Sequence, residues 1–186
     1  MMKTRIAAAL AALAMLSAQA GSAQEALPIV GGAPMSPEKT IVGNAVNSAD
    51  HEVLVAAVEA AGLVPTLSSR GPYTVFAPTD AAFGRISDAS LAALMRPENR
   101  GQLGRVLTCH VVAADVMTQA MTRLIAAGGG QARLSTMGGC ELRAEIGADG
   151  LVLTDENGRA GRITIADVRQ LNGVIHVIDR VMLPAS

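Results

Sequence analysis

The sequence contains few aromatic side chains: its 186 residues include no tryptophan, and the aromatic ones are Tyr73, Phe76 and Phe83. Aromatic faces stack on sugars and on unpaired bases, so this scarcity argues against recognition by stacking. Charged residues are also few, at 17%, and the 15 basic residues are balanced by 16 acidic ones. Because a nucleic-acid partner requires clustered lysine and arginine, we expect no nucleic-acid binding.

The sequence also lacks the common catalytic patterns. It has no Gly-x-Ser-x-Gly pattern, and the glycine run 128–130 is not followed by the Lys-Ser or Lys-Thr of a phosphate-binding loop. The histidines His51, His110 and His176 lack the spacing of metal-binding or protease histidines. Because His110 and His176 lie within β-branched runs, we interpret them as structural residues of the core.

Acidic residues leave one metal-site alternative open. Asp80 or Asp179 could share a metal ion with one of the histidines, although core histidines with satisfied hydrogen bonds are the commoner case. Residues 155–158, Asp-Glu-Asn-Gly, lack the ligand alternation of an EF-hand calcium loop, and the Asn-Gly pair predicts a hairpin turn. We therefore predict no catalytic residue, no cofactor and no bound metal.

The first twenty residues are typical of a secretory signal peptide. Lys3 and Arg5 precede an apolar run from Ile6 to Leu16, and Ala18-Gln19-Ala20 provides the small residues that a signal peptidase requires. A membrane-spanning helix would need about 20 apolar residues, and this run is shorter. We predict a signal peptide over residues 1–20 with cleavage near Ala20, and hence a secreted or periplasmic protein.

The remainder has no second long apolar run, so we expect a soluble chain with no transmembrane anchor after cleavage. Loss of Lys3 and Arg5 leaves 13 basic and 16 acidic residues, a formal charge of −3. A chain of about 160 residues is long enough for one domain with a sizeable core. Residues 21–39 are rich in proline and glycine, and we interpret them as a flexible N-terminal tether.

The chain contains two cysteines, Cys109 and Cys140. An even number of cysteines in an exported protein favours pairing, because the extracytoplasmic environment is oxidising. We predict a Cys109–Cys140 disulfide that stabilises the fold by about 3 to 4 kcal/mol in the chain-entropy account. The alternative is two reduced cysteines in the core.

Hydrophobic periodicity divides the chain into a helical first half and a β-rich second half. We expect a helix after Asp50, its N-cap, ending at Gly62, and further helices within 87–95, within 97–108 and after Asp115, the last one stopped by the glycines at 128–130. From residue 131 the period becomes two, most clearly in Glu141–Ile146, and turn dipeptides containing glycine separate the runs. This order predicts an α+β domain with a β meander.

Two apolar segments, Gly71–Phe83 and Asn172–Pro184, resemble the two signature segments of fasciclin-like domains. Leu107–Val112 and Ile163–Val168 resemble further parts of the family pattern in the same order. The resemblance covers roughly residues 40–184 and implies a fasciclin-like domain there, with an antiparallel β-sandwich-like core wrapped by several helices. Val75, Phe76, Val111 and Val112 would then join the later strands.

The resemblance assigns structural or adhesion roles to a set of residues in these segments: Tyr73, Phe76, Pro78, Thr79, Asp80, Phe83, His110, Asn172, Gly173, His176 and Asp179. We also consider Asp80 as the cap of the helix that begins at Ala81. One position departs from the family pattern, because Cys109 stands where the family has tyrosine before His110. This departure puts in doubt an adhesion role carried by that tyrosine-histidine pair.

The function that these features favour is an exported, non-catalytic adhesion or interaction module that binds a protein, envelope or matrix component. The alternative is a carrier of an apolar small ligand such as a lipid or pigment, suggested by the methionine stripe of Met117 and Met121 and by many small alanines. A hydrolase that uses His110 or His176 ranks last, because no nucleophile is placed beside either residue.

Overall fold

The computed structural model describes residues 26–185, so the predicted signal peptide and the first residues of the predicted tether lie outside the described part. The helices are α1 (Ile41–Ala45), α2 (Glu52–Ala61), α3 (Val64–Ser68), α4 (Asp80–Phe83), α5 (Asp88–Leu94), a 3-10 turn (Pro97–Asn99), α6 (Arg100–Thr108) and α7 (Thr118–Ala127). The strands are β1 (Ile29–Val30), β2 (Ala33–Pro34), β3 (Tyr73–Pro78), β4 (Val111–Val112), β5 (Gln131–Ser135), β6 (Glu141–Gly147), β7 (Gly150–Thr154), β8 (Ala160–Gln170) and β9 (Gly173–Ile178). The predicted α+β class is confirmed.

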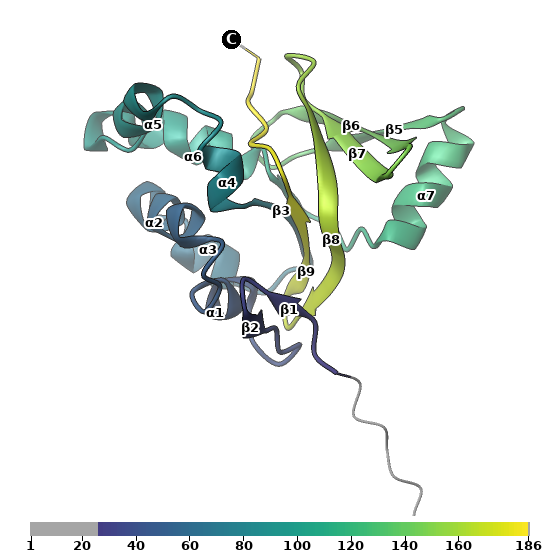
Figure 1. The fold of residues 1–186 in the computed structure, drawn as a ribbon, viewed down its shortest axis with the longest axis horizontal. Coiled ribbons are helices and arrows are strands. Elements are labelled where there is room, and N and C mark those ends of the chain that lie inside the picture. The colour runs from purple at the N-terminus through teal and green to yellow at the C-terminus, as the bar shows by residue number, and fades with distance from the viewer. Residues whose placement is uncertain (1–25, 186) are drawn as a thin grey trace, which may run out of the picture.

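The main sheet of the described residues has seven strands in the order β4-β3-β9-β8-β7-β6-β5. Strands β5 to β9 form the predicted antiparallel meander. Strand β3 pairs in parallel with β9, and β4 adds to β3 in antiparallel orientation. The early valines and Phe76 therefore join the later strands as expected, and Figure 1 shows β3 beside β9.

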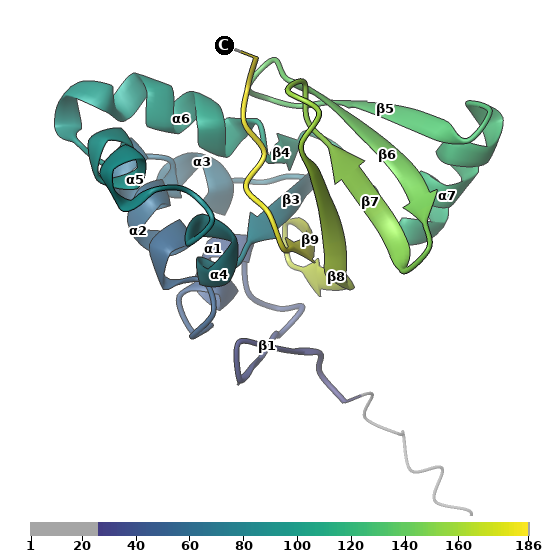
Figure 2. The ribbon, with the colours of Figure 1, turned by 45° about the horizontal axis from the view of Figure 1, so that its top comes forward.

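The two faces of the sheet bury two separate cores, and alternation along β3 shows the division. Val75 and Ala77 belong to the first core, which also contains apolar side chains of α1 to α4 and α6. Phe76 belongs to the second core, which unites β3 and β9 with β5 to β7 and α7. The sheet must therefore curl until its two ends share a core, which gives the sandwich-like arrangement seen in Figure 2.

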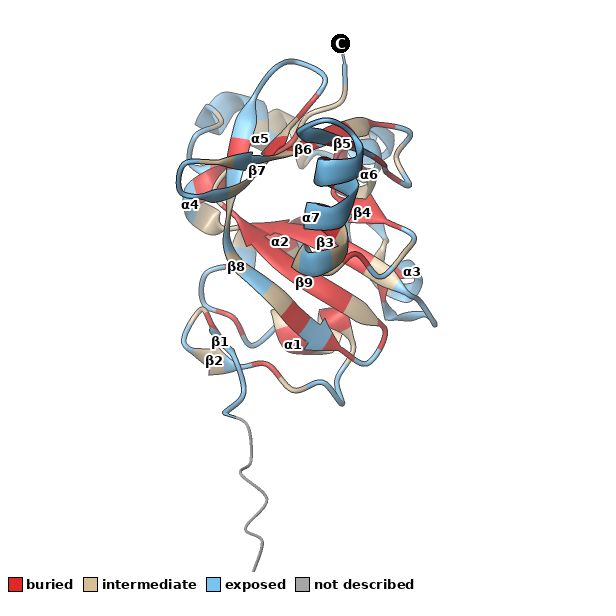
Figure 3. Cartoon of the chain, turned by 90° about the vertical axis from the view of Figure 1, so that its right-hand side faces the viewer, coloured by how far each residue is buried: buried red, intermediate tan, exposed pale blue. Residues whose placement is uncertain are grey.

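The curl of the sheet determines which strands are buried. Figure 3 shows β3 and β9 as buried central strands, with α7 exposing residues at the outside. In β6 the predicted alternation places Leu142 and Ala144 in the second core. It fails at Ile146, which is 59% exposed, because this residue pairs with Leu151 next to the turn of the β6–β7 hairpin.

The predicted helices form, with one correction at a helix start. Helix α2 ends at Gly62, whose φ of 71° lies in the left-handed region that glycine tolerates. Its N-cap is His51 rather than Asp50, and no side chain of the N-cap residue bonds the first turn. The prediction failed because the capping carboxylate comes from elsewhere in the chain, as described below.

From residue 26 onward, the segment before residue 40 is folded, whereas its composition suggested a flexible tether. Strands β1 and β2 form a short antiparallel hairpin, and the Met35 N–H donates to the Pro28 carbonyl at 2.9 Å. Val30 and Met35 are 4% and 2% exposed and pack in the first core. Apolar side chains between the prolines and glycines therefore anchor the part of this segment from residue 26 onward. The first helix then begins at Ile41, with the Thr40 hydroxyl as its cap.

Within residues 26–185, the helices fall short of the length and continuous apolar character that a membrane span requires.

Candidate functional site

The two segments that carry the family resemblance lie side by side in the structure. Their strands β3 and β9 pair in parallel from Tyr73 opposite Gly173 to Pro78 opposite Ile178. The approach is close at the first pair, because a Cβ on Gly173 would lie 1.9 Å from the Tyr73 carbonyl oxygen. Glycine is therefore required at position 173 by space as well as by its φ of 154°.

Asn172 connects the β8–β9 turn to two helices. Its Oδ1 accepts from the Ile41 N–H at 2.9 Å, and its Nδ2 donates to the carbonyls of Leu67 and Ser69 at 2.8 and 2.9 Å. The residue is only 8% exposed. All of these bonds are internal, so the Asn172 side chain acts as a structural connection among β9, α1 and the end of α3.

Thr79 and Asp80 cap two different helices. The Thr79 hydroxyl accepts from the Ala82 N–H and is the N-cap of α4. The Asp80 carboxylate instead accepts from the N–H groups of Glu52 and Val53, at 3.2 and 2.9 Å, and so caps α2. The expectation that Asp80 caps its own helix is wrong, because Thr79 already fills that position.

His176 lies at the centre of the second face with Phe76 stacked against it. The ring centroids are 5.6 Å apart and the planes differ by 23°. His176 Nε2–H donates to the Val116 carbonyl at 2.9 Å, and Nδ1 accepts from the Asp167 N–H at 3.2 Å. Burial lowers the pKa of His176, while the Val116 carbonyl opposes this shift, so the ring is neutral near pH 7.

His110 is held in the opposite tautomer. Its Nδ1–H donates to the Val106 carbonyl and its Nε2 accepts from the Met182 N–H, both at 2.8 Å. Burial lowers the pKa of His110 to about 4. Because both ring nitrogens of His110 and of His176 are bound to backbone, neither ring has a lone pair available to activate a nucleophile.

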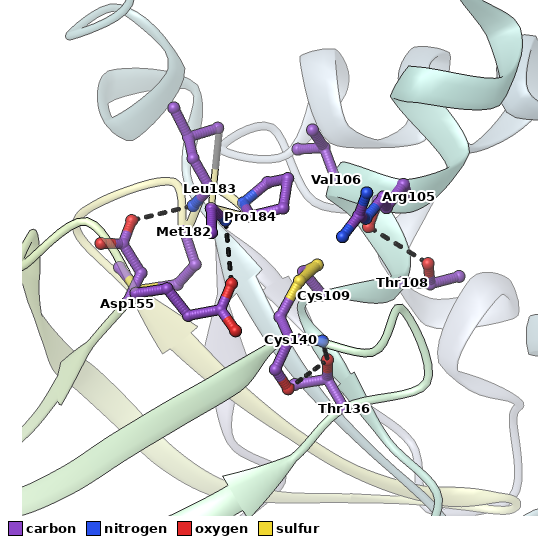
Figure 4. Close-up of a disulfide and its surroundings, with 12 residues drawn as sticks. Arg105, Val106, Thr108, Cys109, Thr136, Cys140, Asp155, Met182, Leu183 and Pro184 are labelled. Atoms are coloured by element: carbon purple, nitrogen blue, oxygen red, sulfur yellow. Dashed lines mark hydrogen bonds between the residues drawn. A yellow bond between two sulfur atoms is a disulfide. The ribbon is translucent and has the colours of Figure 1, made fainter.

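The structure contains the predicted Cys109–Cys140 disulfide, with the Cα atoms 5.3 Å apart. It joins the end of α6 to the start of β6, and both residues are buried. The Thr136 hydroxyl donates to the Cys140 carbonyl at 2.9 Å and accepts from the Cys140 N–H at 3.0 Å (Figure 4). Since Cys109 precedes His110, the bridge fixes the residue whose ring holds Met182.

The C-terminal segment 181–185 is held by the β7–β8 turn as well as by His110. The Asp155 carboxylate accepts from the Leu183 N–H at 2.9 Å (Figure 4). The Glu156 carboxylate accepts from the Ala185 N–H at 2.8 Å. Asp155 also accepts from the N–H of Asn157 and of Arg159. Residues 155–158 thus form the predicted turn, and Asp155, 1% exposed, is a structural acceptor that sequence reasoning missed.

The remaining predicted residues also have structural contacts. Asp179 accepts from the Arg162 N–H at 2.7 Å and forms an ion pair with the Arg162 guanidinium. Pro78 and Phe83 are buried beside the first turn of α4. Tyr73 is half-buried, and its hydroxyl lies 2.9 Å from the Ser69 hydroxyl. The structure therefore separates these residues into several local contacts instead of one reactive cluster.

His51 differs from the other two histidines. It is 3% exposed, its Nδ1 lies 2.8 Å from the Ser48 hydroxyl, and its Nε2 has no hydrogen-bond partner among residues 26–185. Burial lowers the pKa of His51; the nearby Ala77 carbonyl opposes the shift without reaching hydrogen-bond geometry, and Asp80 and Asp50 oppose it through their charge. Within the same described range, no three histidine, cysteine or carboxylate side chains lie together as a metal site would require.

An apolar cavity of about 260 Å³ lies on the helical side of the sheet, among α1, α2, α3, β3 and the end of α6. Leu54, Val58 and Leu67 contribute to its walls, and Val46, 55% exposed, lies at its edge. The methionine stripe does not form this cavity, because Met121 is fully buried in the second core. Sequence periodicity identified the apolar faces of these helices but could not show that they leave space.

A wider and more polar groove of about 690 Å³ lies at the Asn172 end of the sheet. The loop 68–72 forms one wall and the β8–β9 turn the other, and Leu171, 66% exposed, lies at the turn. Arg70 and Arg169 also line the groove. Asn172 bonds to Ser69 across it, so the two walls are fixed relative to each other.

Asp167 is a further structural residue that the sequence analysis did not single out. Its φ of 59° is positive, which is uncommon outside glycine, and it lies at an irregularity of the β8–β9 pairing. Its carboxylate accepts from the Thr118 N–H at 2.7 Å and from the Thr118 hydroxyl, at the start of α7. The irregularity in the β8–β9 pairing thereby directs the Asp167 carboxylate to the first residue of α7. No local sequence pattern predicts this contact.

The parallel pairing of two distant signature strands, the curled sheet and the group of helices α1 to α4 and α6 on one face define a class of domain that comparison with known proteins identifies. The fasciclin domain family profile matches residues 49–184, so the chain belongs to the fasciclin domain family. This confirms the family resemblance noted in the sequence.

Among known relatives, the Synechocystis protein sll1483 is 37% identical over 156 residues, covering 84% of this chain and 79% of that protein. The pig transforming growth factor-beta-induced protein ig-h3 is 33% identical over 132 residues, covering 71% of this chain but only 17% of that protein. A FAS1 domain pair from the insect cell adhesion molecule Fasciclin I shares the fold, with a TM-score of 0.71 and 19% identity; the match covers 79% of this chain and 51% of the pair.

Proposed function

We propose that this protein is an exported, non-catalytic interaction module that binds a protein, envelope or matrix component. The observation that carries the proposal is that residues of the family pattern use their polar atoms in hydrogen bonds within the domain. These residues are His110, His176, Asn172 and Asp80. These residues build a rigid scaffold, and recognition is left to its loops and exposed surfaces. The adhesion role of the Fasciclin I molecule, which shares the fold, is consistent with this proposal.

The groove at the Asn172 end is the surface that we assign to the partner. Its walls are loops fixed by hydrogen bonds, and exposed Leu171 offers an apolar contact beside the cations of Arg70 and Arg169. An apolar anchor within a polar rim is a common arrangement of binding surfaces. Export, which the predicted signal peptide supports, would place this surface outside the cytoplasm.

The test measures binding of the purified protein to envelope and matrix fractions of the producing organism. Leu171→Glu should weaken binding at least tenfold, since it buries a charge at the contact. Ile146→Glu is the matched control, because Ile146 is similarly exposed, at 59%, on β6. Loss of binding in both variants, or in neither, would remove the groove as the surface. Absence of any saturable binding by the unaltered protein would remove the proposal itself.

The apolar cavity supports a second candidate, a carrier of a narrow apolar ligand. Its volume of about 260 Å³ lies just below the range of about 300 to 1,000 Å³ of typical small-molecule sites, which suits a short acyl or polyene segment. Val55→Phe would fill the cavity, whereas Val152→Phe on β7 is a control at a half-buried site elsewhere. Titration with a fluorescent polyene fatty acid should saturate for the control and fail for Val55→Phe; equal or absent binding in both contradicts the carrier function.

A further inference from the structure

Three arginines line one depression between α4, α5 and the C-terminal segment. Arg85 follows α4, Arg159 lies in the β7–β8 turn, and Arg180 follows β9. The depression has a volume of about 420 Å³. Figure 2 shows the C-terminal segment running beside α4 and past the turn that precedes β8. The other residues of its wall are Ala82, Ile86, Ser87, Ser90, Val181 and Leu183.

The positive charge in this depression is not balanced locally. None of its lining residues is acidic, and none of the three arginines forms an ion pair within residues 26–185. Two carboxylates beside the lining arginines have other partners: Asp179, which precedes Arg180, is paired with Arg162, and Asp155 accepts backbone N–H groups. Three arginines without an ion-pair partner among the described residues therefore line one depression, in a chain whose 15 basic residues are outnumbered by 16 acidic ones.

Two donor groups of the residues that line this depression have no acceptor in the described part of the chain. Arg180 Nε is buried and has no hydrogen-bond partner in the described part of the chain. Buried donors are almost always satisfied in native proteins, so an unsatisfied one points to a missing acceptor. In addition, the Ser87 hydroxyl donates to the Ser90 hydroxyl at 2.8 Å, which leaves the Ser90 hydrogen free to donate to a ligand.

We propose that this depression binds an oxyanion group, namely a phosphate, sulfate or carboxylate. The planar guanidinium fork matches the paired oxygens of these groups, and it keeps its charge at all physiological pH values. The volume exceeds that of a free ion, and Ile86, Val181 and Leu183 provide apolar surface for the carbon skeleton that carries the anion. The site thus fits a small acidic unit such as a sugar acid or a phosphorylated sugar.

This inference goes beyond the proposed interaction function and does not depend on it. The depression and the groove near Asn172 share no lining residue. A free small anion can therefore bind whether or not the groove contacts an envelope partner. Binding of small anions and binding to envelope fractions are separate measurements, so failure of one leaves the other standing.

The experiment is a titration of the purified full chain with sodium phosphate, sodium sulfate and sodium glucuronate, each at constant ionic strength against sodium chloride. Nitrogen-15 NMR reports the Arg180 Nε–H resonance directly. We expect a saturable shift of that resonance with at least one of the anions. The Arg85→Gln/Arg159→Gln double variant should bind at least tenfold more weakly, and it leaves half-buried Arg180 in place to preserve folding.

The matched control is Arg123→Gln/Arg143→Gln, which removes the same charge from exposed arginines of α7 and β6. It should bind as the unaltered protein does, because its arginines are outside the depression. Response to phosphate or sulfate but not glucuronate assigns a tetrahedral anion, and the reverse assigns a carboxylate; either supports the site. Lack of saturation with all three anions, or equal affinity of the two double variants, overturns it.

Discussion

Phe76 and His176 are register partners of the parallel β3–β9 pair, and their rings stack with centroids 5.6 Å apart. The phenyl ring is fully buried and is part of the buried, apolar surroundings that keep the imidazole neutral. The neutral form is also required by hydrogen bonding, since Nδ1 must accept from the Asp167 N–H. A proton on Nδ1 would turn this nitrogen into a donor that faces the Asp167 N–H, so the hydrogen bond would be lost. Protonation of His176 therefore destabilises the fold, which makes its stability depend on pH.

Acidification should destabilise the protein as histidines take up protons. Burial lowers the pKa values of His51 and His176, and that of His110 to about 4, below the value of about 6.5 that is usual for an exposed ring. The unfolded chain therefore binds protons first, so stability is full above about pH 6.5 and falls toward pH 4. His110 alone accounts for about 3 kcal/mol of this loss.

Urea unfolding between pH 7.5 and 5 measures this dependence. His110→Gln should be less stable than the unaltered protein at pH 7.5. Its free energy of unfolding should nevertheless decrease less steeply on acidification, because unfolding of this variant takes up about one proton fewer. Constant or rising stability on acidification to pH 5 would contradict the assignment of neutral, buried rings.

Removal of the disulfide should destabilise the fold by about 3 to 4 kcal/mol, because Cys109 and Cys140 are separated by 31 residues and the bridge restricts the unfolded chain. The measurement is urea unfolding of the protein with and without reductant. Cys109→Ala/Cys140→Ala should show the lower stability in both conditions and should not respond to reductant. Equal stability of oxidised and reduced protein would count against a stabilising bridge.

Asp80→Ala should cost about 1 kcal/mol, because it removes the carboxylate that caps α2. Asp80→Asn should cost less, since an amide oxygen can still accept from the Val53 N–H. Glu38→Ala, at an exposed acid, is the control for loss of charge. Hydrogen exchange of the first-turn amides of α2 locates the effect; unchanged exchange in Asp80→Ala would show that this cap is not needed.

Two glycine-to-alanine substitutions should have opposite effects. Gly173→Ala places a Cβ 1.9 Å from the Tyr73 carbonyl oxygen, a clash with backbone that the β3–β9 pair cannot relieve, and we expect a loss of at least about 4 kcal/mol. Gly104→Ala in α6 meets no atom within 4 Å and should stabilise by about 1 kcal/mol through helix propensity. Thermal unfolding compares the two. Similar stability of both variants would contradict the close approach at Gly173.

Local sequence patterns predicted the structure correctly where it depends on interactions between residues close together in the chain. Alternation in β6 located Leu142 and Ala144 in a core, and the glycine turns located the meander. The same reasoning assigned Asp80 to the wrong helix, because a carboxylate can cap whichever helix end the fold brings near it. The apolar cavity and the arginine depression were missed for a related reason: each combines residues from elements that are far apart in sequence.

By itself, the sequence determined the α+β class, the β meander of the second half, the family and the two cysteines that form the bridge. Those properties follow from the hydrophobic periodicity, from the residues typical of turns and from the segments that resemble the family pattern. Each of these features can be recognised in a short stretch of sequence. Only the tertiary structure decided the ring tautomers, the partner of Asp80, the packing of Met35 and the grouping of Arg85, Arg159 and Arg180. These depend on the curl of the sheet, which brings side chains together through long-range packing that no local pattern specifies.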